Sequence, residues 1–390
     1  MAKNSRTPSI RFKGFTDAWE QRKLGDVVKI TMGQSPDGST YSDTPTKYIL
    51  VQGNADLVDG WVSPRMWTTQ ITKQAEAGDL IMSVRAPAGS MGKTAYNVVL
   101  GRGVAGIKGN EYIFQLLVKK DTDGYWKTLS AGSTFESINS NSVVNAEIAL
   151  PCESEQQKIG AYFEKLDNII TLYQRKYEKF VNIKKALLEK MFPQGDEKVP
   201  RIRFKGFTGA WEQRKLGDIG RVAMNRRIFK EQTSVSGEVP FFKIGTFGGE
   251  PDAFISDELY QVYKEQYPYP QIGDILLSAS GSIGKMVEYK GEKAYFQDSN
   301  IVWLEHDTSV SNSFLKCFYA VVKWAGLEGS TIKRLYNKNI LETQISLPSY
   351  KEQLLIGLFF EQLDNLITLH QRQVEKLKNI KSALLANMFI

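Results

Sequence analysis

The stretch IRFKGFTDAWEQRKLGDV at residues 10–27 returns as IRFKGFTGAWEQRKLGDI at residues 202–219. The two copies differ only at Asp17, which becomes Gly209, and at their last residue, valine against isoleucine. So long a match within one chain indicates an internal duplication. We therefore expect two globular segments that share one fold, each opened by a copy of this stretch.

A second repeat closes each copy. Residues 150–193 align without a gap to residues 347–390, and both segments begin with Leu-Pro. The order along the chain is therefore globular, helical, globular, helical. The predicted boundaries are 1–150 and 201–347 for the globular segments, 151–193 and 348–390 for the helical segments, and 194–200 for the linker.

Between these ends the globular segments share only short echoes. Gly78–Ser83 matches Gly273–Ser278, and a Gly-Ser-x-Gly-Lys pattern follows at residues 89–93 and 281–285. A Gly-Ser-Thr triplet then occurs at residues 132–134 and 329–331. Our hypothesis for this pattern is one scaffold that carries two different specificities.

The globular segments have a mixed α/β pattern. Short β-like runs alternate with glycine-rich loops, and helix-like stretches lie between them. The predicted strands include residues 48–51, 80–84, 275–277 and 300–304, and one predicted helix is 314–324.

The closing segments have the apolar spacing of a coiled coil. Apolar residues recur in alternating steps of four and three from Ile159 to Phe180, and equivalent positions run from Ile356 to Leu377, with His370 at one of them. The pattern then shifts by one position, to Ile183 and Leu187 in one copy and to Ile380 and Leu384 in the other. We predict two helices of about 35 residues, roughly 50 Å long, that pack antiparallel and hold the globular segments apart.

Composition limits the class of protein. The chain has 390 residues, of which 42% are apolar and 24% are charged, and no stretch approaches the roughly 18 apolar residues of a membrane span. Cys152 and Cys317 are too few for a disulfide framework. We expect a two-domain cytoplasmic protein with no membrane partner. The net charge of +7 is spread along the chain, so it permits DNA binding without requiring it.

The sequence offers little for catalysis. Gly92-Lys93-Thr94 ends like a phosphate-binding P-loop, but Pro87 stands where that loop needs glycine. A metal-dependent nuclease site built from Asp252, Glu288 and Lys290 stays an alternative, although the other half has no such set. The chain has only two histidines, which argues against a repeated histidine-based site. We expect no catalytic residue and no bound metal.

These features together resemble the specificity subunit of type I restriction–modification systems. The resemblance rests on the repeated frames at 10–26 and 202–218, the Gly-Asp-apolar-Ser and Gly-Ser-x-Gly-Lys echoes, and the helices of pattern LP…EQ…IG..F..LD..I. It covers essentially the whole chain. It implies two target-recognition domains, each reading one half of a split, asymmetric DNA site, with the paired helices setting the gap.

The resemblance also implies partners. Two methyltransferase subunits and the restriction subunits would bind S-adenosylmethionine, ATP and Mg²⁺, while this chain would bind no cofactor itself. Competing hypotheses are a coiled-coil scaffold whose globular segments bind proteins, and the self-contained nuclease described above.

Candidate DNA contacts come from loops with exposed donors. Glycine lets a backbone approach phosphates closely, whereas arginine, lysine and asparagine read base edges or phosphates. The alternatives are a structural turn for the first loops and loop capping for Asn139 and Asn141. The candidates are Arg85, Ser90, Lys93, Asn139, Asn141, Arg226, Arg227, Ser280, Ser282, Lys285, Lys333, Arg334, Tyr336, Lys338 and Asn339. Arg85 has no counterpart in the second half, which favours it for sequence reading.

Other repeated residues have different expected roles. Trp19 and Trp211 lie in the constant frame, where a core or subunit contact is favoured over base stacking. The helical positions that recur off the seam are candidates for contacts with partner subunits, and the alternative is a solvated helix face. These are Gln174, Arg175, Gln371 and Arg372.

Overall fold

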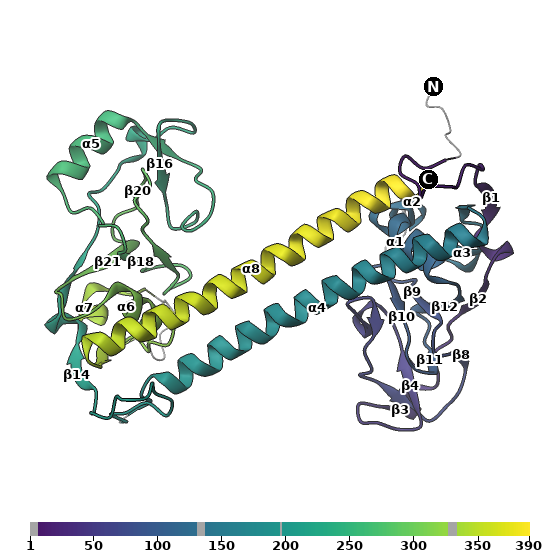
Figure 1. The fold of residues 1–390 in the computed structure, drawn as a ribbon, viewed down its shortest axis with the longest axis horizontal. Coiled ribbons are helices and arrows are strands. Elements are labelled where there is room, and N and C mark those ends of the chain that lie inside the picture. The colour runs from purple at the N-terminus through teal and green to yellow at the C-terminus, as the bar shows by residue number, and fades with distance from the viewer. Residues whose placement is uncertain (1–6, 131–136, 196, 327–333) are drawn as a thin grey trace. The chain divides into compact units, whose positions relative to one another are not determined.

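The structure, a computed structural model, describes residues 7–130, 137–195, 197–326 and 334–390. Contacts divide the chain into two compact units: unit 1 is Met1–Lys176 with His370–Ile390, and unit 2 is Tyr177–Leu369. Two long helices, α4 (Glu153–Met191) and α8 (Tyr350–Met388), contribute residues to both units (Figure 1). Each has 39 residues, about 58 Å at 1.5 Å per residue, so both are longer than predicted.

Unit 1 is built on a six-stranded sheet of order β2-β12-β9-β10-β6-β5 and a five-stranded sheet of order β3-β7-β4-β11-β8. A separate antiparallel pair joins β1 to β13. The strands are β1 (Glu20–Lys23), β2 (Lys29–Met32), β3 (Tyr41–Ser42), β4 (Tyr48–Val51), β5 (Leu57–Val58), β6 (Trp61–Val62), β7 (Trp67–Thr68), β8 (Lys73–Ala75), β9 (Leu80–Ser83), β10 (Met91–Lys93), β11 (Val98–Leu100), β12 (Val104–Lys108) and β13 (Glu147–Leu150). The short helices are α1 (Glu111–Thr122), α2 (Tyr125–Ser130) and α3 (Ser140–Val144).

Unit 2 repeats this plan with fewer strands. Its sheets have the orders β15-β21-β18-β19 and β17-β16-β20, and β14 pairs with β22 as β1 does with β13. The strands are β14 (Glu212–Lys215), β15 (Gly220–Ala223), β16 (Val239–Phe242), β17 (Phe254–Ile255), β18 (Ile275–Ser278), β19 (Met286–Glu288), β20 (Tyr295–Phe296), β21 (Ile301–His306) and β22 (Gln344–Leu347). The helices are α5 (Asp257–Gln266), α6 (Asn312–Tyr319) and α7 (Asn337–Glu342).

The repeated opening stretch packs against the end of a long helix in each unit. In unit 1, buried Trp19 contacts Tyr112 and Phe389, with ring centroids 5.9 and 6.4 Å away. In unit 2, buried Trp211 contacts Phe192 and Phe314 at 5.8 Å each. The backbone matches as well, because Ile10 N donates to Asn387 O and Ile202 N to Lys190 O, both at 2.9 Å. The predicted core role of the two tryptophans is confirmed.

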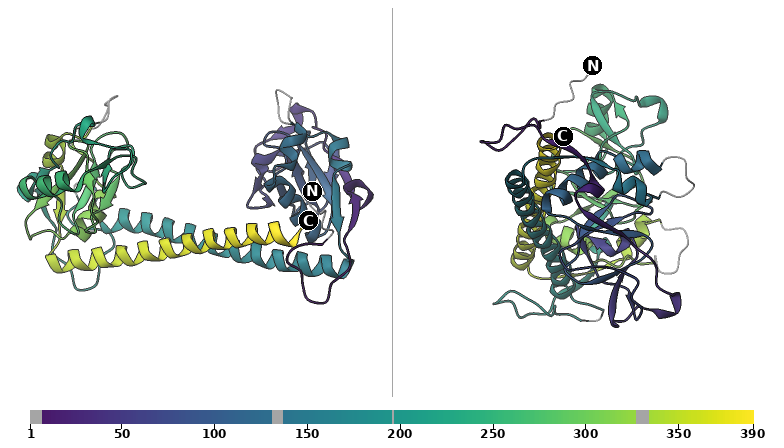
Figure 2. Two further views of the ribbon diagram at one scale, coloured as in Figure 1. Left: turned by 90° about the horizontal axis from the view of Figure 1, so that it is seen from above. Right: turned by 90° about the vertical axis from the view of Figure 1, so that its right-hand side faces the viewer.

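The two long helices run antiparallel within each unit. In unit 1, Asp167 of α4 binds Lys381 of α8 at 2.6 Å, whereas Tyr173, further along α4, contacts His370, which lies earlier in α8. In unit 2, Lys184 binds Asp364 at 2.5 Å. Figure 2 shows the opposed chain directions. Ile159, Phe163, Ile356 and Phe360 of the predicted seam are buried, and most of the other predicted seam residues are half-buried.

The predicted fold class is confirmed, with corrections to individual elements. The strand at Tyr48–Val51 is as predicted, but β21 extends beyond the predicted end to His306. The helix predicted over 314–324 is α6, which ends at Tyr319 because the chain turns to pack Val321, Val322 and Trp324 against the core. The predicted seam position Ile380 is wrong: this side chain is 40% exposed, and Lys381 turns inward to Asp167 instead.

Within the described parts of the chain, no helix is both long and apolar enough to cross a membrane.

Candidate nucleic-acid interface

Three segments that are distant in sequence meet at one end of the strands of a sheet in each unit. This sheet is the six-stranded one in unit 1 and the four-stranded one in unit 2. In unit 1, Val84 N donates to Gly103 O at 2.8 Å, and Ile138 N donates to Val84 O at 2.9 Å. In unit 2, Ala279 N donates to Asn300 O at 2.7 Å, and Leu335 N donates to Ala279 O at 2.8 Å. The two candidate segments named from the sequence are therefore neighbours in space, and a third segment joins them.

The end of the first sheet strand lies at the same edge. In unit 1 the register of β2, β12 and β9 brings residues 33–35 there, since Gly33 N donates to Val104 O at 2.9 Å. In unit 2 the register of β15, β21 and β18 does the same for residues 224–226. We call these four-segment surfaces the loop edges. They are residues 33–35, 84–86, 101–103 and 137–139 in unit 1, and 224–226, 279–281, 298–300 and 334–336 in unit 2.

The Gly-Ser-x-Gly-Lys echo does not mark equivalent positions. Ser83 N donates to Ser90 O at 2.8 Å, whereas Ser278 N donates to Lys285 O at 2.9 Å, so Ser90 corresponds to Lys285. Lys93 lies opposite Leu80, and Glu288 lies opposite the equivalent Ile275. The predicted match is therefore wrong by three residues.

The physical reason for this register is the turn after the serine. Gly89 N bonds Ser83 O at 2.8 Å and Gly284 N bonds Ser278 O at 3.0 Å, with φ of 108° and 81°. A positive φ of this size favours glycine, so the conformation fixes which glycines are equivalent. A Cβ at Gly89 would also lie 2.4 Å from Oδ1 of Asp121, whose pKa is raised by burial.

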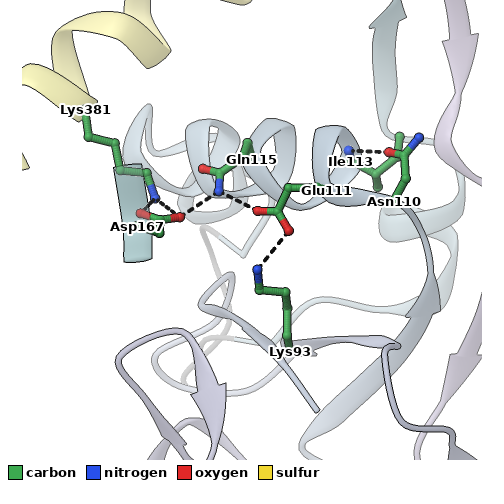
Figure 3. A network of polar contacts seen from close by, with 7 residues as sticks. All are labelled: Lys93, Asn110, Glu111, Ile113, Gln115, Asp167 and Lys381. Atoms are coloured by element: carbon green, nitrogen blue, oxygen red, sulfur yellow. Dashed lines mark hydrogen bonds and ion pairs between the residues drawn. The ribbon is translucent and has the colours of Figure 1, made fainter. Parts of the chain in front are cut away.

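Lys93 is held inside unit 1 (Figure 3). Its Nζ donates to Glu111 at 2.8 Å and lies 5.1 and 4.9 Å from the ring centroids of Trp61 and Phe114. Buried Gln115 donates to Glu111 at 2.9 Å and to Asp167 at 2.8 Å, and Lys381 completes the chain of contacts. These contacts favour a structural role for Lys93 over a phosphate contact.

The other loop residues also have protein partners. Lys285 Nζ donates to Phe247 O, Ser280 Oγ donates to Asn300 Oδ1 at 2.8 Å, and the carbonyl of Ser282 accepts from Ser278 Oγ. Ser90 is half-buried. The structural-turn alternative thus has direct support for the loop, while DNA contact by these four residues stays a prediction.

Arg85 differs from them. Its backbone pairs with Ser137 and its carbonyl accepts from Ser83 Oγ at 2.9 Å, but its side chain is exposed. No ion pair joins it to any residue in the described ranges. Contact of the exposed guanidinium with DNA stays a prediction.

Two asparagines of the second segment, Asn139 and Asn339, cap short helices. Asn139 Oδ1 accepts from Ser142 N at 2.9 Å at the start of α3, and Asn339 Oδ1 accepts from Tyr336 N at 3.0 Å while its Nδ2 donates to Ala325 O. Asn141 is exposed, and its carbonyl accepts from Asn145. The capping alternative is realised for Asn139 but not by the side chain of Asn141, and base contact by any of the three stays a prediction.

Basic and aromatic side chains are paired at residues 334–336 of unit 2, which correspond to residues 137–139 of unit 1. Arg334 Nη2 donates to Ser299 O at 3.5 Å, and its guanidinium lies 5.7 Å from the ring of Tyr336, which is 61% exposed. Lys338 is exposed, with Glu342 at 3.8 Å. Lys333 and both Gly-Ser-Thr triplets lie outside the described residues.

Arg226 lies at the loop edge of unit 2, after β15, and Arg227 follows it in the chain. Both are exposed, and their guanidinium groups lie 5.2 Å from the Tyr267 ring and 5.6 Å from the Phe229 ring. Such stacking holds an arginine in place and leaves its N–H groups free to donate.

The carboxylates of the nuclease alternative are engaged in ion pairs. Asp252 binds Lys243 at 2.9 Å, and Glu288 binds Lys316 at 2.7 Å. Within the described residues, no group of three or more His, Cys, Asp or Glu side chains is arranged to hold a metal ion.

Comparison with known proteins decides the family. The family described as "Type I restriction modification DNA specificity domain" matches this chain twice, at residues 16–180 and 209–379. The chain belongs to this family.

Relatives of this chain are named specificity subunits of type I restriction enzymes. The S.HindORF215P specificity subunit of Haemophilus influenzae is 54% identical over 158 residues, which is 40% of this chain and 41% of that protein. The MjaIX specificity subunit of Methanocaldococcus jannaschii is 23% identical over 409 residues, covering 95% of this chain and 92% of that protein. The first alignment spans less than half of the relative, whereas the second spans nearly all of it.

Solved structures share the fold of this specificity subunit. The S subunit of the type I system of M. genitalium matches with a TM-score of 0.67 at 15% identity, over 98% of this chain and 99% of that one. A chain from a structure on complex assembly and conformational transition of the type I R-M system matches with a TM-score of 0.54 at 18% identity, over 94% and 96%. At these identities the likeness shows the fold alone.

The helix residues expected to contact partners are mostly exposed. Arg175 and Arg372 are exposed, Gln371 donates to Glu375 at 3.2 Å, and Gln174 lines a cavity of about 400 Å³ in unit 1.

Sequence reasoning missed an apolar pair on the outer face of each long helix. Ile169 and Leu172 of α4 are 38% and 51% exposed, and Leu366 and Leu369 of α8 are 39% and 51% exposed. They occupy the same places in the repeat. The signal was in the sequence, as apolar residues off the seam that recur in both copies.

Proposed function

We propose that this specificity subunit reads a bipartite, asymmetric DNA site, with each loop edge contacting one half. The observation that carries the proposal is that both units build the same four-segment edge and fill it with different polar side chains. Arg85 and Ser137 occupy the places that Ser280 and Arg334 occupy in unit 2. Two different side-chain sets on one scaffold are what two different half-sites require.

The charge of the loop edges supports contact with DNA. Exposed arginines lie at both edges, Arg85 in unit 1 and Arg226 in unit 2, and Arg334 stacks on an exposed tyrosine. Arginine binds phosphates and purine edges through several N–H donors at once. The modest net charge of +7 is therefore compatible with binding, because each edge carries arginines.

The long helices supply the proposed spacer and partner surface. Most of their seam residues are buried or half-buried, while the outer apolar pairs at Ile169 and Leu172 and at Leu366 and Leu369 are exposed. Because the same pair occurs on both helices, we propose that two copies of one partner, the methyltransferase subunit, dock there. Restriction subunits would join this complex. The cofactors S-adenosylmethionine, ATP and Mg²⁺ would belong to these partners.

The test is to map methylated adenines in cells that express this chain with a matching methyltransferase subunit. We expect a split motif with a fixed gap, altered on one side only when residues 28–149 are exchanged for those of another specificity subunit. Lengthening both helices by one turn should widen the gap. An assembled complex that methylates no motif would instead favour the protein-binding scaffold, and DNA affinity that falls steeply with salt would argue against that scaffold.

A further inference from the structure

The turn between β11 and β12 presents an arginine that the sequence analysis did not single out. Gly101, Arg102 and Gly103 form this turn in unit 1. A Cβ at Gly103 would lie 2.1 Å from Gln52 O, and one at Gly101 would lie 3.1 Å from Val51 O. A Cβ at Gly103 would displace backbone and one at Gly101 would be tightly packed, so Arg102 is the position of this turn that best accommodates a large side chain.

Several hydrogen bonds fix the turn. Arg102 N donates to Ser35 Oγ at 3.2 Å, Gln34 N donates to Leu100 O at 2.8 Å, and Val84 N donates to Gly103 O at 2.8 Å. The backbone that carries Arg102 is thus tied to two other segments of the loop edge. A reading side chain needs such a rigid base, because a mobile one loses more entropy on binding.

Arg102 is exposed and adjoins Arg85. The bond between Val84 and Gly103 makes the backbones of the two arginines neighbours, and neither arginine forms an ion pair with a residue in the described ranges. Two exposed guanidinium groups that form no ion pair with any carboxylate among the described residues favour an anionic or acceptor-rich ligand.

Unit 2 has an arginine at the equivalent junction, but from a different segment. Ser299, with φ of 55°, takes the place of Arg102, and Ser280 takes the place of Arg85. Arg334, which corresponds to Ser137, reaches across to the carbonyl of Ser299 at 3.5 Å. The backbone bonds are shared, while the position that supplies the arginine changes.

We propose that Arg102 reads a guanine edge in the half-site bound by unit 1, with Arg334 as its counterpart in unit 2. This inference rests on the proposed function. A contact that only positions the phosphate backbone would be retained on the shared scaffold. Here the two units share the scaffold but supply the arginine from different segments, which suits a residue that reads sequence. The guanine O6 and N7 acceptors match the paired donors of arginine.

The test uses the full chain assembled with its methyltransferase subunits. Wild type, Arg102→Ala, Arg102→Lys and Arg334→Ala are compared for adenine-methylation motifs and for binding to the cognate duplex and to each single-base variant. Arg22→Ala is the matched control, because Arg22 is an exposed arginine of unit 1 outside the loop edge. Thermal unfolding checks that each variant folds.

We expect Arg102→Ala to weaken cognate binding about 10- to 100-fold and to relax the sequence requirement at one G·C pair of one half-site. Arg102→Lys should keep binding to non-cognate DNA but lose the discrimination. Arg334→Ala should relax the other half-site only. The control should behave as wild type.

Two results would overturn the inference. One is that the complex with Arg102→Ala methylates the same motif as the wild-type complex. The other is an equal loss of affinity for all sequences with a salt slope reduced by about one, which is the behaviour of a phosphate contact. A wild-type complex that methylates no split motif would instead refute the proposed function, and this inference with it.

Discussion

Arg11 binds Glu155 through two parallel hydrogen bonds, Nε to Oε1 at 2.7 Å and Nη2 to Oε2 at 2.8 Å, and the carboxylate is completely buried. Arg203 and Glu352 form the same pair in unit 2, at 2.7 Å for both bonds. The arginine comes from the repeated opening stretch, and the glutamate comes from the first turn of the following long helix. The hydrogen bond to the carboxylate raises the pKa of each arginine.

This geometry predicts a large loss of stability for Arg11→Ala. Removing the guanidinium leaves a buried carboxylate without its partner, which costs about 3–5 kcal/mol. The loss is measured as the decrease in the free energy of unfolding of unit 1 in a chemical denaturant. The double variant Arg11→Leu with Glu155→Met should recover most of it, since no buried charge is left. A single variant as stable as wild type would contradict the proposed importance of the pair.

A second prediction concerns the aromatic cluster at the helix end. Phe389→Ala should destabilise unit 1 by about 3–5 kcal/mol, because the ring packs on Trp19, Tyr112 and Phe163. Hydrogen exchange should show the loss in residues 10–150 and not in unit 2. Phe192→Ala is the matched variant and should give the opposite pattern. Loss of protection in both units from either change would show that the units do not fold as separate cooperative bodies.

The opening stretches and the long helices could be predicted from the sequence because each occurs twice in the chain. The repeat located both long helices and both core tryptophans, and apolar spacing located most of the seam. The shift at Ile380 was misjudged, because apolar periodicity alone does not show that Lys381 turns inward to pair with the half-buried carboxylate of Asp167.

The loop edges could be predicted only in part. Residues 84 and 138 lie far apart in sequence, and nothing local indicates the hydrogen bond that joins their backbones. The shared Gly-Ser-x-Gly-Lys pattern gave a wrong alignment of residues 89–93 with residues 281–285. The equivalent glycines are determined by their positive φ and not by the identity of the neighbouring residues. Arg102 was missed because its position is defined by the sterics of two glycines packed against Gln52 and Val51.

A third prediction follows from those sterics. Gly103→Ala forces a Cβ to within 2.1 Å of Gln52 O, so the turn must move, at a cost of about 1–3 kcal/mol. We expect weaker and less specific DNA binding, measured by titration of the cognate duplex. Gly38→Ala is the control in the same unit, because no atom lies within 4 Å of its added Cβ. Equal behaviour of the two variants would mean that the turn does not contribute to binding.

A fourth prediction concerns the cysteines of the folded chain. Cys152 is exposed, whereas Cys317 is buried, and burial raises the pKa of the Cys317 thiol to about 12. A thiol-specific reagent at pH 8 should therefore label Cys152 rapidly and Cys317 only after unfolding. A raised pKa in the folded state also means that the contribution of Cys317 to stability is complete below pH 9 and is lost as pH rises toward 12. Fast labelling of native Cys152→Ser would contradict the burial.

The outer faces of the long helices give a fifth prediction, on assembly. Leu172 and Leu369 are 51% exposed at equivalent places in the repeat, so each should bury its side chain when a methyltransferase subunit docks. Leu172→Asp should remove one docking position and Leu369→Asp the other, so each single variant should bind one methyltransferase subunit and the double variant none, as measured by mass photometry. Because neither side chain lies in a core, thermal unfolding of the isolated chain should change little. Leu172→Met is the matched control and should assemble as wild type does, since it keeps an apolar side chain of similar volume. If the double aspartate variant still assembles with two partners, the subunits dock elsewhere on the chain.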